Sequence, residues 1–490
     1  MKGLSPERLT SLDDVAVPAY DRSKVTVGIV HFGVGNFHRS HQAMFLDSLM
    51  NRGEALDWGI CGVGVLPTDL RMREALARQS GLYTLVMKHA DGRTDARVIG
   101  SIIDYLYAPE DREAVLERLA HPGTRIVSLT ITEGGYGVPE PDDAAGSDVV
   151  PGFRFSPFVL IAEALQLRIE RGLEPFTVLS CDNIEKNGDV AKQRVIEAAR
   201  KAAIPGLESW IGDHVSFPNS MVDRITPATT DVDRALVSER FHLIDTWPVV
   251  CEPFVQWVLE DDFSAGRPAY EKAGVELVDD VTPYELMKLR LLNASHQAIA
   301  YFGSLLGFTY AHEAVGHPSI AALMRDYMRV EATPTLLPVP RIDLDEYQES
   351  LLERFANPEI RDTLARLATD ASERIPKWVL PVIRENLAAG RSIAHATAVV
   401  ASWARYCAGN DENGRPLTQV DVRAEELRLA ARSSEPAAFL ALHEIFGELA
   451  EDQRFASAFA SLLATIRAHG AEPLLRRLAD EVAAPSGAVR

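Results

Sequence analysis

The amino-acid sequence predicts an α/β protein of two domains, a parallel-sheet domain over residues 1–281 and a mostly α-helical domain over residues 282–490. In the first part, short runs of β-branched residues alternate with helical stretches, which is typical of a parallel sheet covered by helices on both faces. Beyond Thr282 almost every segment has the periodicity of a helix. A chain of 490 residues is also too long for one hydrophobic core of usual size.

The parallel-sheet domain begins with a strand over residues 25–32, which ends in glycine and leads directly into a helix. Further strands are expected where β-branched and aromatic residues cluster between turn residues. These strands cover residues 58–65, 83–87, 97–100, 126–132, 177–180 and 247–251, and helices are expected over residues 111–119 and 157–171.

The helical domain has a well-marked start. Thr282 is the expected N-cap, Pro283 takes the first helical position, and Glu285 completes a Thr-x-x-Glu capping box. This first helix extends to residue 301. The helices expected after it cover residues 320–327, 345–355, 358–367, 379–387, 393–407, 424–431, 437–446 and 452–469.

Composition restricts the kinds of partner. Hydrophobic content of 47% with 24% charged residues is typical of a globular protein, and the net charge of −20 argues against nucleic-acid binding. No apolar run approaches the ~20 residues of a membrane helix, and the polar first residues contain no export signal. Four widely spaced cysteines predict neither disulfides nor structural zinc. We expect a cytoplasmic protein that acts on a small molecule and, since no self-complementary patch is visible, a monomer.

A glycine pair, Gly33-x-Gly35, lies between the first strand and its helix. Such a pair lets the backbone approach a pyrophosphate, so it predicts a dinucleotide site, although His38 replaces the third glycine of the usual motif. Asp69 follows the second strand, where an acid accepts hydrogen bonds from ribose hydroxyls and favours NAD over NADP. An ordinary tight turn is the alternative.

Two nearby patterns do not predict a second ligand site. Gly62-Val63-Gly64 is another Gly-x-Gly, but no helix directly follows it, so a bulge or close backbone approach is the preferred interpretation. His31, His38 and His41 resemble metal ligands. Because no cysteine or carboxylate nearby completes a coordination shell, we expect no metal.

The predicted helix over residues 282–301 is apolar on most sides. At ~100° per residue, with Lys288 at zero, Glu285, His296 and Asn293 fall within about 140° on one side. A buried ammonium must be paired or lower its pKa, and a lysine with a lowered pKa can act as a general base. Alternatively, Lys288 reaches solvent or pairs with Asp280 or Glu285.

These residue types suit the oxidation of an alcohol, which needs a base, a hydride acceptor and donors that bind the substrate oxygen. Lys288 is the candidate base, Asn293 an amide donor, and His296 a contact to a neighbouring hydroxyl. Asn183 follows the strand over residues 177–180, at the edge where α/β sheets bind ligands, and forms the other half of an oxyanion-binding pair with Asn293. Alternatively, Asn293 and His296 are buried polar groups with satisfied hydrogen bonds, and Glu285 is either a capping acid or a proton relay.

A second candidate base is Tyr284, because Tyr284-x-x-x-Lys288 has the Tyr-x3-Lys spacing of short-chain dehydrogenases. This chain is much longer than those enzymes and lacks their TGxxxGxG loop. Tyr284 also lies in the first helical turn, so it stays the minor alternative.

Six motifs, distributed over most of the chain, resemble those of one family, the polyol-specific long-chain dehydrogenases. They are GVGNFHRSHQ (33–42), SLTITEGGYG (128–137), SCDNIEKNG (180–188), FPNSMVDRITP (217–227), VVCEPFVQWVLED (249–261) and DVTPYELMKLRLLNASH (280–296). The resemblance implies a Rossmann-type NAD-binding domain and a helical domain like the C-terminal domain of 6-phosphogluconate dehydrogenase.

The resemblance also implies residue roles in a metal-independent hydride transfer between a secondary alcohol and NAD. The implied catalytic residues are Lys288 as base, Asn183 and Asn293 as oxyanion-binding pair, His296 at the substrate and Glu285 as a gate for proton exit. The implied cofactor-binding residues are Gly33, Gly35, Asn36, Phe37, Asp69, Thr132 and Glu133, and the implied substrate-binding residues are Asp223, Arg366 and Arg374.

Within the family, the motifs are most similar to those of members that interconvert D-mannitol and D-fructose. Arabinitol dehydrogenases and fructuronate, tagaturonate or altronate oxidoreductases share much of the pattern. Arg374 stands where the mannitol enzymes are expected to have lysine, and the two side chains are not interchangeable. A protein that binds NAD(H) without catalysis is a more remote alternative, because fold alone does not fix function.

Overall fold

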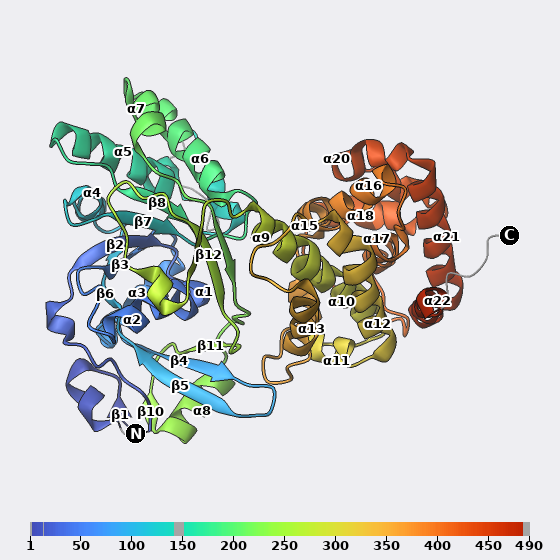
Figure 1. The fold of residues 1–490 in the computed structure, drawn as a ribbon, viewed down its shortest axis with the longest axis horizontal. Coiled ribbons are helices and arrows are strands. Elements are labelled where there is room, and N and C mark those ends of the chain that lie inside the picture. Colours follow the sequence, from blue (N-terminus) through green and yellow to red (C-terminus); the bar gives the residue numbers. More distant parts are fainter. Residues whose placement is uncertain (1, 13, 142–150, 484–490) are drawn as a thin grey trace. The chain divides into compact units, whose positions relative to one another are not determined.

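The computed structural model describes residues 2–12, 14–141 and 151–483. The chain divides into two compact units, Met1–Thr282 and Pro283–Arg490. The first unit contains sheets and helices, whereas the second is built from helices (Figure 1). None of the helices in the described ranges has the length and apolar character that crossing a membrane requires.

The main sheet of the first unit has five parallel strands in the order β6-β3-β2-β7-β8. Their bounds are β2 Val27–Phe32, β3 Gly59–Gly64, β6 Ile102–Tyr107, β7 Ile126–Leu129 and β8 Thr177–Ser180. This is the Rossmann order, in which the chain reverses its direction of travel across the sheet between β2 and β7. The loops after these two strands therefore lie where ligands of such sheets bind.

Helices cover both faces of this sheet, as the sequence predicts (Figure 1). Val30 and Phe32 face a core formed with α4, α5 and α6, whereas Ile29, which alternates with them, faces α2 and α3. The helices of this unit are α1 Asn36–Ser40, α2 Gln42–Met50, α3 Asp69–Arg78, α4 Arg112–Ala120, α5 Pro157–Glu170, α6 Asn187–Lys201, α7 Leu207–His214 and α8 Asp231–Phe241.

Three predicted strands belong to a separate sheet of order β11-β4-β5, rather than to the parallel sheet. These strands are β4 Tyr83–Lys88, β5 Thr94–Ile99 and β11 Val249–Cys251, and β4 and β5 are antiparallel. Another sheet has the order β13-β12-β9, with β9 Ser220–Asp223, β12 Gln256–Glu260 and β13 Glu276–Val278. The short strands β1 Lys2–Gly3 and β10 Leu243–Ile244 pair with each other.

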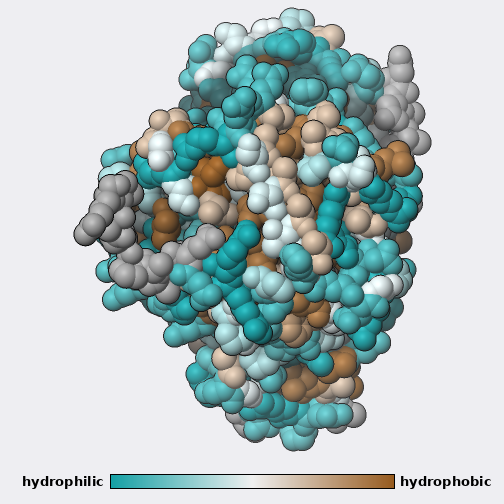
Figure 2. Space-filling view, turned by 90° about the vertical axis from the view of Figure 1, so that its right-hand side faces the viewer, coloured by the Kyte–Doolittle hydropathy of each residue, from teal (hydrophilic) through white to brown (hydrophobic). Residues whose placement is uncertain are grey.

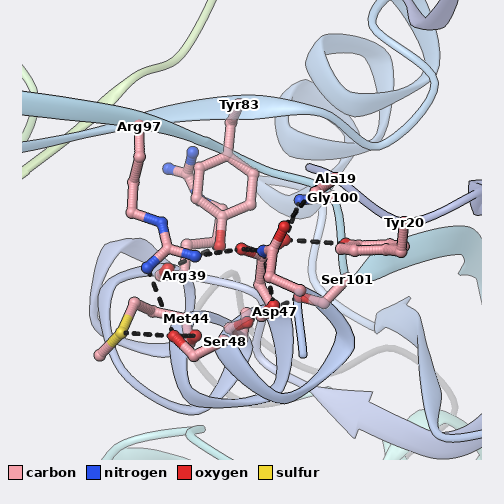
Figure 3. A network of polar contacts seen from close by, with 12 residues as sticks. Ala19, Tyr20, Arg39, Met44, Asp47, Ser48, Tyr83, Arg97, Gly100 and Ser101 are labelled. Carbon is pink, nitrogen blue, oxygen red and sulfur yellow. Dashed lines mark hydrogen bonds and ion pairs between the residues drawn. The ribbon is translucent and has the colours of Figure 1, made fainter. Parts of the chain in front are cut away.

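A fully buried carboxylate, Asp47 on α2, joins this helix to its surroundings (Figure 3). It accepts hydrogen bonds from the Tyr20 hydroxyl (2.8 Å) and the backbone N–H of Gly100 (2.9 Å), and it forms an ion pair with Arg97. Because a buried charge is tolerated only when it is satisfied, these contacts fix α2 against the link between β5 and β6.

The second unit is a helical assembly around α17, which packs against α10 and α21. Its helices are α9 Thr282–Met287, α10 Ala294–Leu305, α11 Ala311–Val315, α12 Pro318–Asp326, α13 Leu344–Phe355, α14 Leu364–Leu367, α15 Ala371–Trp378, α16 Leu380–Ala388, α17 Ala394–Cys407, α18 Ala424–Arg432, α19 Ala437–Leu440, α20 His443–Phe446, α21 Gln453–His469 and α22 Ala471–Ala483. On the face shown in Figure 2, hydrophilic residues predominate and hydrophobic residues form small, separate groups.

Three predicted helices differ in the structure. The helix over 282–301 is not a continuous α-helix, because residues Lys288–Asn293 form a π-helix between α9 and α10. Only α14 forms within 358–367, since Leu364 donates its N–H to the Thr309 carbonyl and the Asp362 carbonyl accepts from Ala311. These long-range backbone bonds replace the first turns of the predicted helix. The segment 437–446 divides into α19 and α20.

A buried carboxylate also begins the central helix of this unit. Glu331, which is fully buried, accepts hydrogen bonds from the backbone N–H groups of His395 (3.0 Å) and Ala396 (2.8 Å) and from the Ser392 hydroxyl (2.8 Å). The N–H groups at the start of α17, which have no partner within the helix, are thereby satisfied. Burial raises the pKa of Glu331, but hydrogen bonds and the adjacent His395 outweigh burial, and the pKa lies below its ordinary value.

We therefore predict that Glu331→Gln lowers the stability of the protein at pH 7 by about 2–3 kcal/mol, or a Tm decrease of about 5–10 °C. A carboxyl with a depressed pKa stabilises the fold above its unfolded pKa of about 4.3, and this contribution is lost as the pH falls through the lower folded value. The difference between the two proteins should consequently shrink below about pH 4.3, which calorimetry across pH measures. The exposed Glu349, paired with Arg325, provides the control. A Glu349→Gln effect as large as that of Glu331→Gln would contradict the assignment.

Candidate active site

The loop after β2 has a conformation that requires glycine. Gly33 has φ +87°, and a Cβ on it would lie 2.2 Å from the carbonyl oxygen of Thr130, which follows β7. Gly35 is the N-cap of α1, and a Cβ there would meet only the Gly33 carbonyl, at 3.7 Å. The loop is thus closely packed against β7 on one side and open at Gly35.

A buried histidine on β2, His31, supports this loop through Thr130. The Thr130 hydroxyl donates to the Gly33 carbonyl (2.8 Å), so its oxygen is left to accept from His31 Nε2 (2.9 Å). His31 Nδ1 must then accept from the Ser128 hydroxyl, at 2.8 Å. Burial lowers the pKa of His31 to about 3, and the neutral Nε2–H tautomer is therefore the one present.

Arg39, on α1, also holds this loop through hydrogen bonds. Its fully buried guanidinium donates to the Gly35 carbonyl (3.3 Å), to Asn36 Oδ1 (2.8 Å) and to the Trp247 carbonyl. The side chain also lies over the Tyr83 ring, with the guanidinium carbon 5.1 Å from the ring centre (Figure 3). Burial lowers the pKa of Arg39 to about 10, so the group stays charged at neutral pH.

The other two histidines of the segment also have structural contacts. His38 stacks on His31, with ring centres 3.4 Å apart, and burial lowers its pKa well below the usual value. His41 ends α1 after five residues, and its Nε2 lies 2.8 Å from the Gln256 carbonyl. The three rings therefore do not form a metal site. Within residues 2–12, 14–141 and 151–483, no group of three or more histidine, cysteine or acidic side chains is arranged to hold a metal ion.

Asp69 begins α3, and one of its oxygens already has a structural role. Oδ2 accepts the backbone N–H groups of Val65 and Leu66, both at 2.9 Å, just after β3. A Cβ on Gly64 would lie 2.7 Å from Asp69 Cβ, so glycine at this position leaves space for the acid. The second oxygen, Oδ1, has no hydrogen-bond donor among the described residues, and it is the atom that a ribose hydroxyl would meet.

A buried aspartate organises the loop after β7. Asp182 Oδ1 accepts from the N–H of Thr132 (2.7 Å), and Oδ2 accepts from the N–H of Ile131 (3.1 Å) and the Tyr136 hydroxyl (2.9 Å). Thr132 has φ +61° and ψ 167°, a region almost restricted to glycine, which costs about 1–3 kcal/mol. Burial raises the pKa of Asp182. Its hydrogen bonds hold Thr132 in a conformation that it would otherwise leave.

The remaining predicted residues of the first unit lie close to these loops or at a strand end. Asn36 donates to the Pro227 carbonyl (3.0 Å), and Phe37 stacks on His41. Of the loop residues, Thr132 and Glu133 are both exposed. Asn183 is also exposed and directly follows the buried Asp182, while Asp223 is buried at the end of β9.

In the second unit, Lys288 and Asn293 are the first and last residues of the π-helix, and they are only 8% and 5% exposed. On an α-helix these residues would differ by the ~140° that the sequence predicts. A π-helix bonds residue i to i+5, so residues five apart stand above one another, as residues four apart do on an α-helix. The π-helix therefore places both residues on one face of the helix, closer than predicted.

The amide of Asn293 has an unused atom. In the described part of the chain, its buried Oδ1 has no hydrogen-bond partner. Buried polar atoms without partners are rare, and a ligand is one group that would satisfy such an atom. His296, half-buried on α10, contacts the Phe355 ring at 4.6 Å, and Glu285 is buried on α9.

Both arginines predicted to bind substrate have contacts in this unit. Arg366 forms a two-pronged ion pair with Asp362, with Nε 2.6 Å from Oδ1. Arg374 donates to the Leu367 carbonyl (3.3 Å) and lies over the Trp378 ring. The structure thus places both near α14, and their contact with substrate stays a prediction.

Sequence reasoning missed three features of these sites. Arg39 and Asp182 are each adjacent to predicted residues, but which backbone groups they bind depends on segments distant in sequence. The π-helix has no signal in hydrophobic periodicity, because six residues are too few to establish a new period. Of these features, only Arg39 had a visible sign in the sequence, as an arginine in the short helix that follows the glycine loop.

A glycine loop at the reversal point of a Rossmann sheet, followed by a helical unit with a buried lysine and a buried asparagine, defines the class of two-domain nicotinamide-dependent dehydrogenases. The chain belongs to the mannitol dehydrogenase family. Residues 27–272 match the mannitol dehydrogenase Rossmann domain, and residues 280–467 match the mannitol dehydrogenase C-terminal domain.

Similar proteins cover almost the whole chain. Mannitol 2-dehydrogenase of Pyrenophora tritici-repentis is 44% identical over 97% of this chain and 86% of its own length. The structure is similar to that of Pseudomonas fluorescens mannitol 2-dehydrogenase in a ternary complex with NAD and D-mannitol, with TM-score 0.88 and 43% identity over 98% of this chain and 100% of that one. It is also similar to a D-sorbitol dehydrogenase, with TM-score 0.86 and 33% identity over 96% and 100% of the two chains.

We predict that Asp182→Asn destabilises the protein by about 1–3 kcal/mol, because an amide cannot accept at both of its ends and leaves a buried N–H or hydroxyl unpaired. Thermal unfolding followed by circular dichroism measures the change. Thr132→Gly is the matched control, since glycine adopts this conformation without strain and should leave Tm unchanged or higher. Equal losses in both variants would show that Asp182 does not act by holding the strained residue.

Proposed function

We propose that this chain oxidises D-mannitol to D-fructose with NAD, and catalyses the reverse reduction, with a lysine as general base and without a metal ion. The observation that carries the proposal is the similarity of 43–44% identity, over nearly the full chain, to mannitol 2-dehydrogenases, one of them in complex with NAD and D-mannitol. The identity to the D-sorbitol dehydrogenase is lower, at 33%.

In the proposed reaction, Lys288 Nζ accepts the proton of the C2 hydroxyl. The hydrogen on that carbon leaves as hydride, so the alcohol loses two electrons and becomes a ketone. NAD, when bound, supplies the hydride acceptor. Asn293 and Asn183 donate N–H groups to the substrate oxygen as negative charge develops on it. The unpartnered end of the Asn293 amide in the described part of the chain is Oδ1, which accepts, so it is available for a hydrogen bond from a substrate hydroxyl.

The other predicted residues complete the assignment. His296 binds a neighbouring hydroxyl, and Glu285 carries the proton away from the lysine. The cofactor is held by the open Gly33–Gly35 loop with Asn36 and Phe37, by Thr132 and Glu133, and by Asp69 at the ribose. The accessibility of Thr132 and Glu133 beside the β2 and β7 loops agrees with a ligand site there.

Substrate preference is proposed to depend on Asp223, Arg366 and Arg374, which bind the distal hydroxyls. Arg374 replaces the lysine expected in mannitol enzymes, and a planar guanidinium presents its donors differently from an ammonium. Arabinitol and the sugar acids are therefore the alternative substrates to compare.

Initial rates with NAD and a panel of D-mannitol, D-arabinitol, D-sorbitol and sugar acids test this function. Mannitol is expected to give the highest kcat/KM. Rapid turnover of a sugar acid with none of mannitol would overturn the substrate. Binding of NADH by calorimetry, without turnover of any compound in the panel, would instead favour a non-catalytic NAD(H)-binding protein.

For the mechanism, we predict that Lys288→Ala reduces kcat by about 10²–10⁴-fold, which is the usual contribution of a general base. NADH affinity should stay within about twofold, because the first unit alone forms the predicted cofactor loops. Stopped-flow turnover and fluorescence titration measure the two effects. Tyr284→Phe is the control, as the minor alternative base. Near-normal activity of Lys288→Ala, or a larger loss in Tyr284→Phe, would refute the lysine as base.

For the cofactor, we predict that Asp69→Asn raises the use of NADP relative to NAD by at least about tenfold, because it removes the charge that repels a 2′-phosphate. The asparagine keeps one oxygen to accept from Val65 and Leu66, so Tm should hardly change. Asp69→Ala removes both functions and should lower Tm as well. An unchanged NADP-to-NAD ratio of kcat/KM in both variants would contradict the role.

The monomeric state and the cytoplasmic location stay predictions. All four cysteines are free and buried, which is compatible with a reducing compartment. Light scattering would measure the first, with a monomer at 53.8 kDa.

A further inference from the structure

The helix that carries the proposed base contains an element that needs support. A π-helix is rare and occurs mostly as a single turn at functional sites. The π-helix Lys288–Asn293 separates Lys288 from Asn293 by one residue more than an α-helical turn. If the same residues wound as a regular α-helix, Asn293 would lie about 140° from Lys288 around the helix axis. The surroundings of this turn therefore decide whether the two groups share a face.

The turn is held by Arg290, in its middle. Arg290 is only 7% exposed, and its guanidinium forms a two-pronged ion pair with Glu385 on α16, with Nη1–Oε2 2.9 Å and Nη2–Oε1 2.7 Å. Nη1 also donates to the Thr335 carbonyl, at 2.6 Å. Such charge-assisted, two-pronged bonds are both stronger and more directional than single neutral ones.

The backbone of the same residue is held too. The Arg290 carbonyl accepts a hydrogen bond from the Tyr327 hydroxyl, at 3.0 Å. Tyr327 is 1% exposed and begins the second π-helix of this unit, Tyr327–Ala332. Burial raises the pKa of Tyr327, so its hydroxyl keeps the proton that it donates. Side chain and backbone of Arg290 are thus fixed by three separate segments, around Tyr327, Thr335 and Glu385.

We propose that Arg290 is a positioning residue for the reaction, which maintains the π-helix and thereby the alignment of Lys288 with Asn293. Glu385 and Tyr327 act through it. The proposal rests on the proposed function, because it assigns Arg290 to the residues named there as base and oxyanion donor. None of the three side chains needs to touch the substrate, so the effect falls on kcat rather than on substrate affinity.

A merely structural ion pair would give a different result. Its loss would lower Tm and leave the kcat of the folded protein unchanged. The pair of Arg325 with Glu349 is the matched control in the same unit, since it has the same chemistry between α12 and α13 but its arginine is exposed, whereas Arg290 is buried and Glu385 is exposed, and it lies outside both π-helices. Exposed pairs of this kind contribute about 0–1 kcal/mol.

The experiment compares Arg290→Lys, Glu385→Gln and Tyr327→Phe with Arg325→Lys and Glu349→Gln, in the full chain with NAD and the substrate that the panel identifies. Arg290→Lys keeps the charge but loses the fork, and Tyr327→Phe removes one oxygen and should fold normally. For these two we expect kcat to fall about 10–100-fold, the range that small misplacements of reacting groups produce, with KM and NADH affinity within about twofold. The two control variants should retain full kcat.

A further measurement addresses coupling. In the double variant Tyr327→Phe/Glu385→Gln, the losses in ln kcat should be less than additive, because both changes release the same turn. Full kcat in folded Arg290→Lys and Tyr327→Phe would overturn the proposal, as would a loss that follows Tm and appears equally in the controls. Lys288→Ala separates the two ideas. If Lys288→Ala retains activity, the assignment of Lys288 as the base is wrong. If Lys288→Ala is inactive but the Arg290 variant is fully active, only the positioning role of Arg290 is rejected.

Discussion

Both units depend on one physical constraint, that a charge taken out of water must be satisfied where it lies. Asp47 and Arg39 connect α1 and α2 to distant backbone in the first unit, and Glu331 begins α17 in the second. Leaving one such group unpaired costs several times more than an ordinary hydrogen bond contributes. The loops and helix ends near the candidate site therefore have few alternative conformations, although they contain little regular structure.

How much of the fold the sequence could predict depends on whether an element is decided by local patterns or by partners distant in the chain. The Rossmann-type domain, the helical domain and four strands of the main sheet follow from local patterns, because a buried parallel strand is a short β-branched run wherever it occurs. The strand Ile102–Tyr107 was missed, because the prediction ended the preceding strand at Gly100 and expected no further strand before the helix at 111–119. Residues 358–363 were predicted as helix because their competing backbone partners, Thr309 and Ala311, lie about 50 residues away.

The candidate site divides in the same way. Lys288, Asn293 and the glycine loop were visible in the sequence because a buried lysine and a Gly-x-Gly after a strand are unusual on their own. The partners that hold them are ordinary residues. Arg39, Asp182 and Arg290 differ from surface arginines and aspartates only in what the fold brings to them, and no local pattern records that. The groups proposed to react could thus be singled out from local patterns, whereas the residues that hold them in place could not.

The π-helix has an evolutionary consequence. A π-turn differs from an α-turn by one residue, and downstream of it the helix continues in the ordinary geometry of α10. Such a turn therefore absorbs a one-residue insertion into a regular helix that already aligned a lysine and an asparagine four residues apart, without a new element or a new core. The residues of α9 and those of α10 thereby keep nearly the relative facing that a regular helix one residue shorter would give them. In this view, the geometry of the site is a matter of chain length as much as of residue identity.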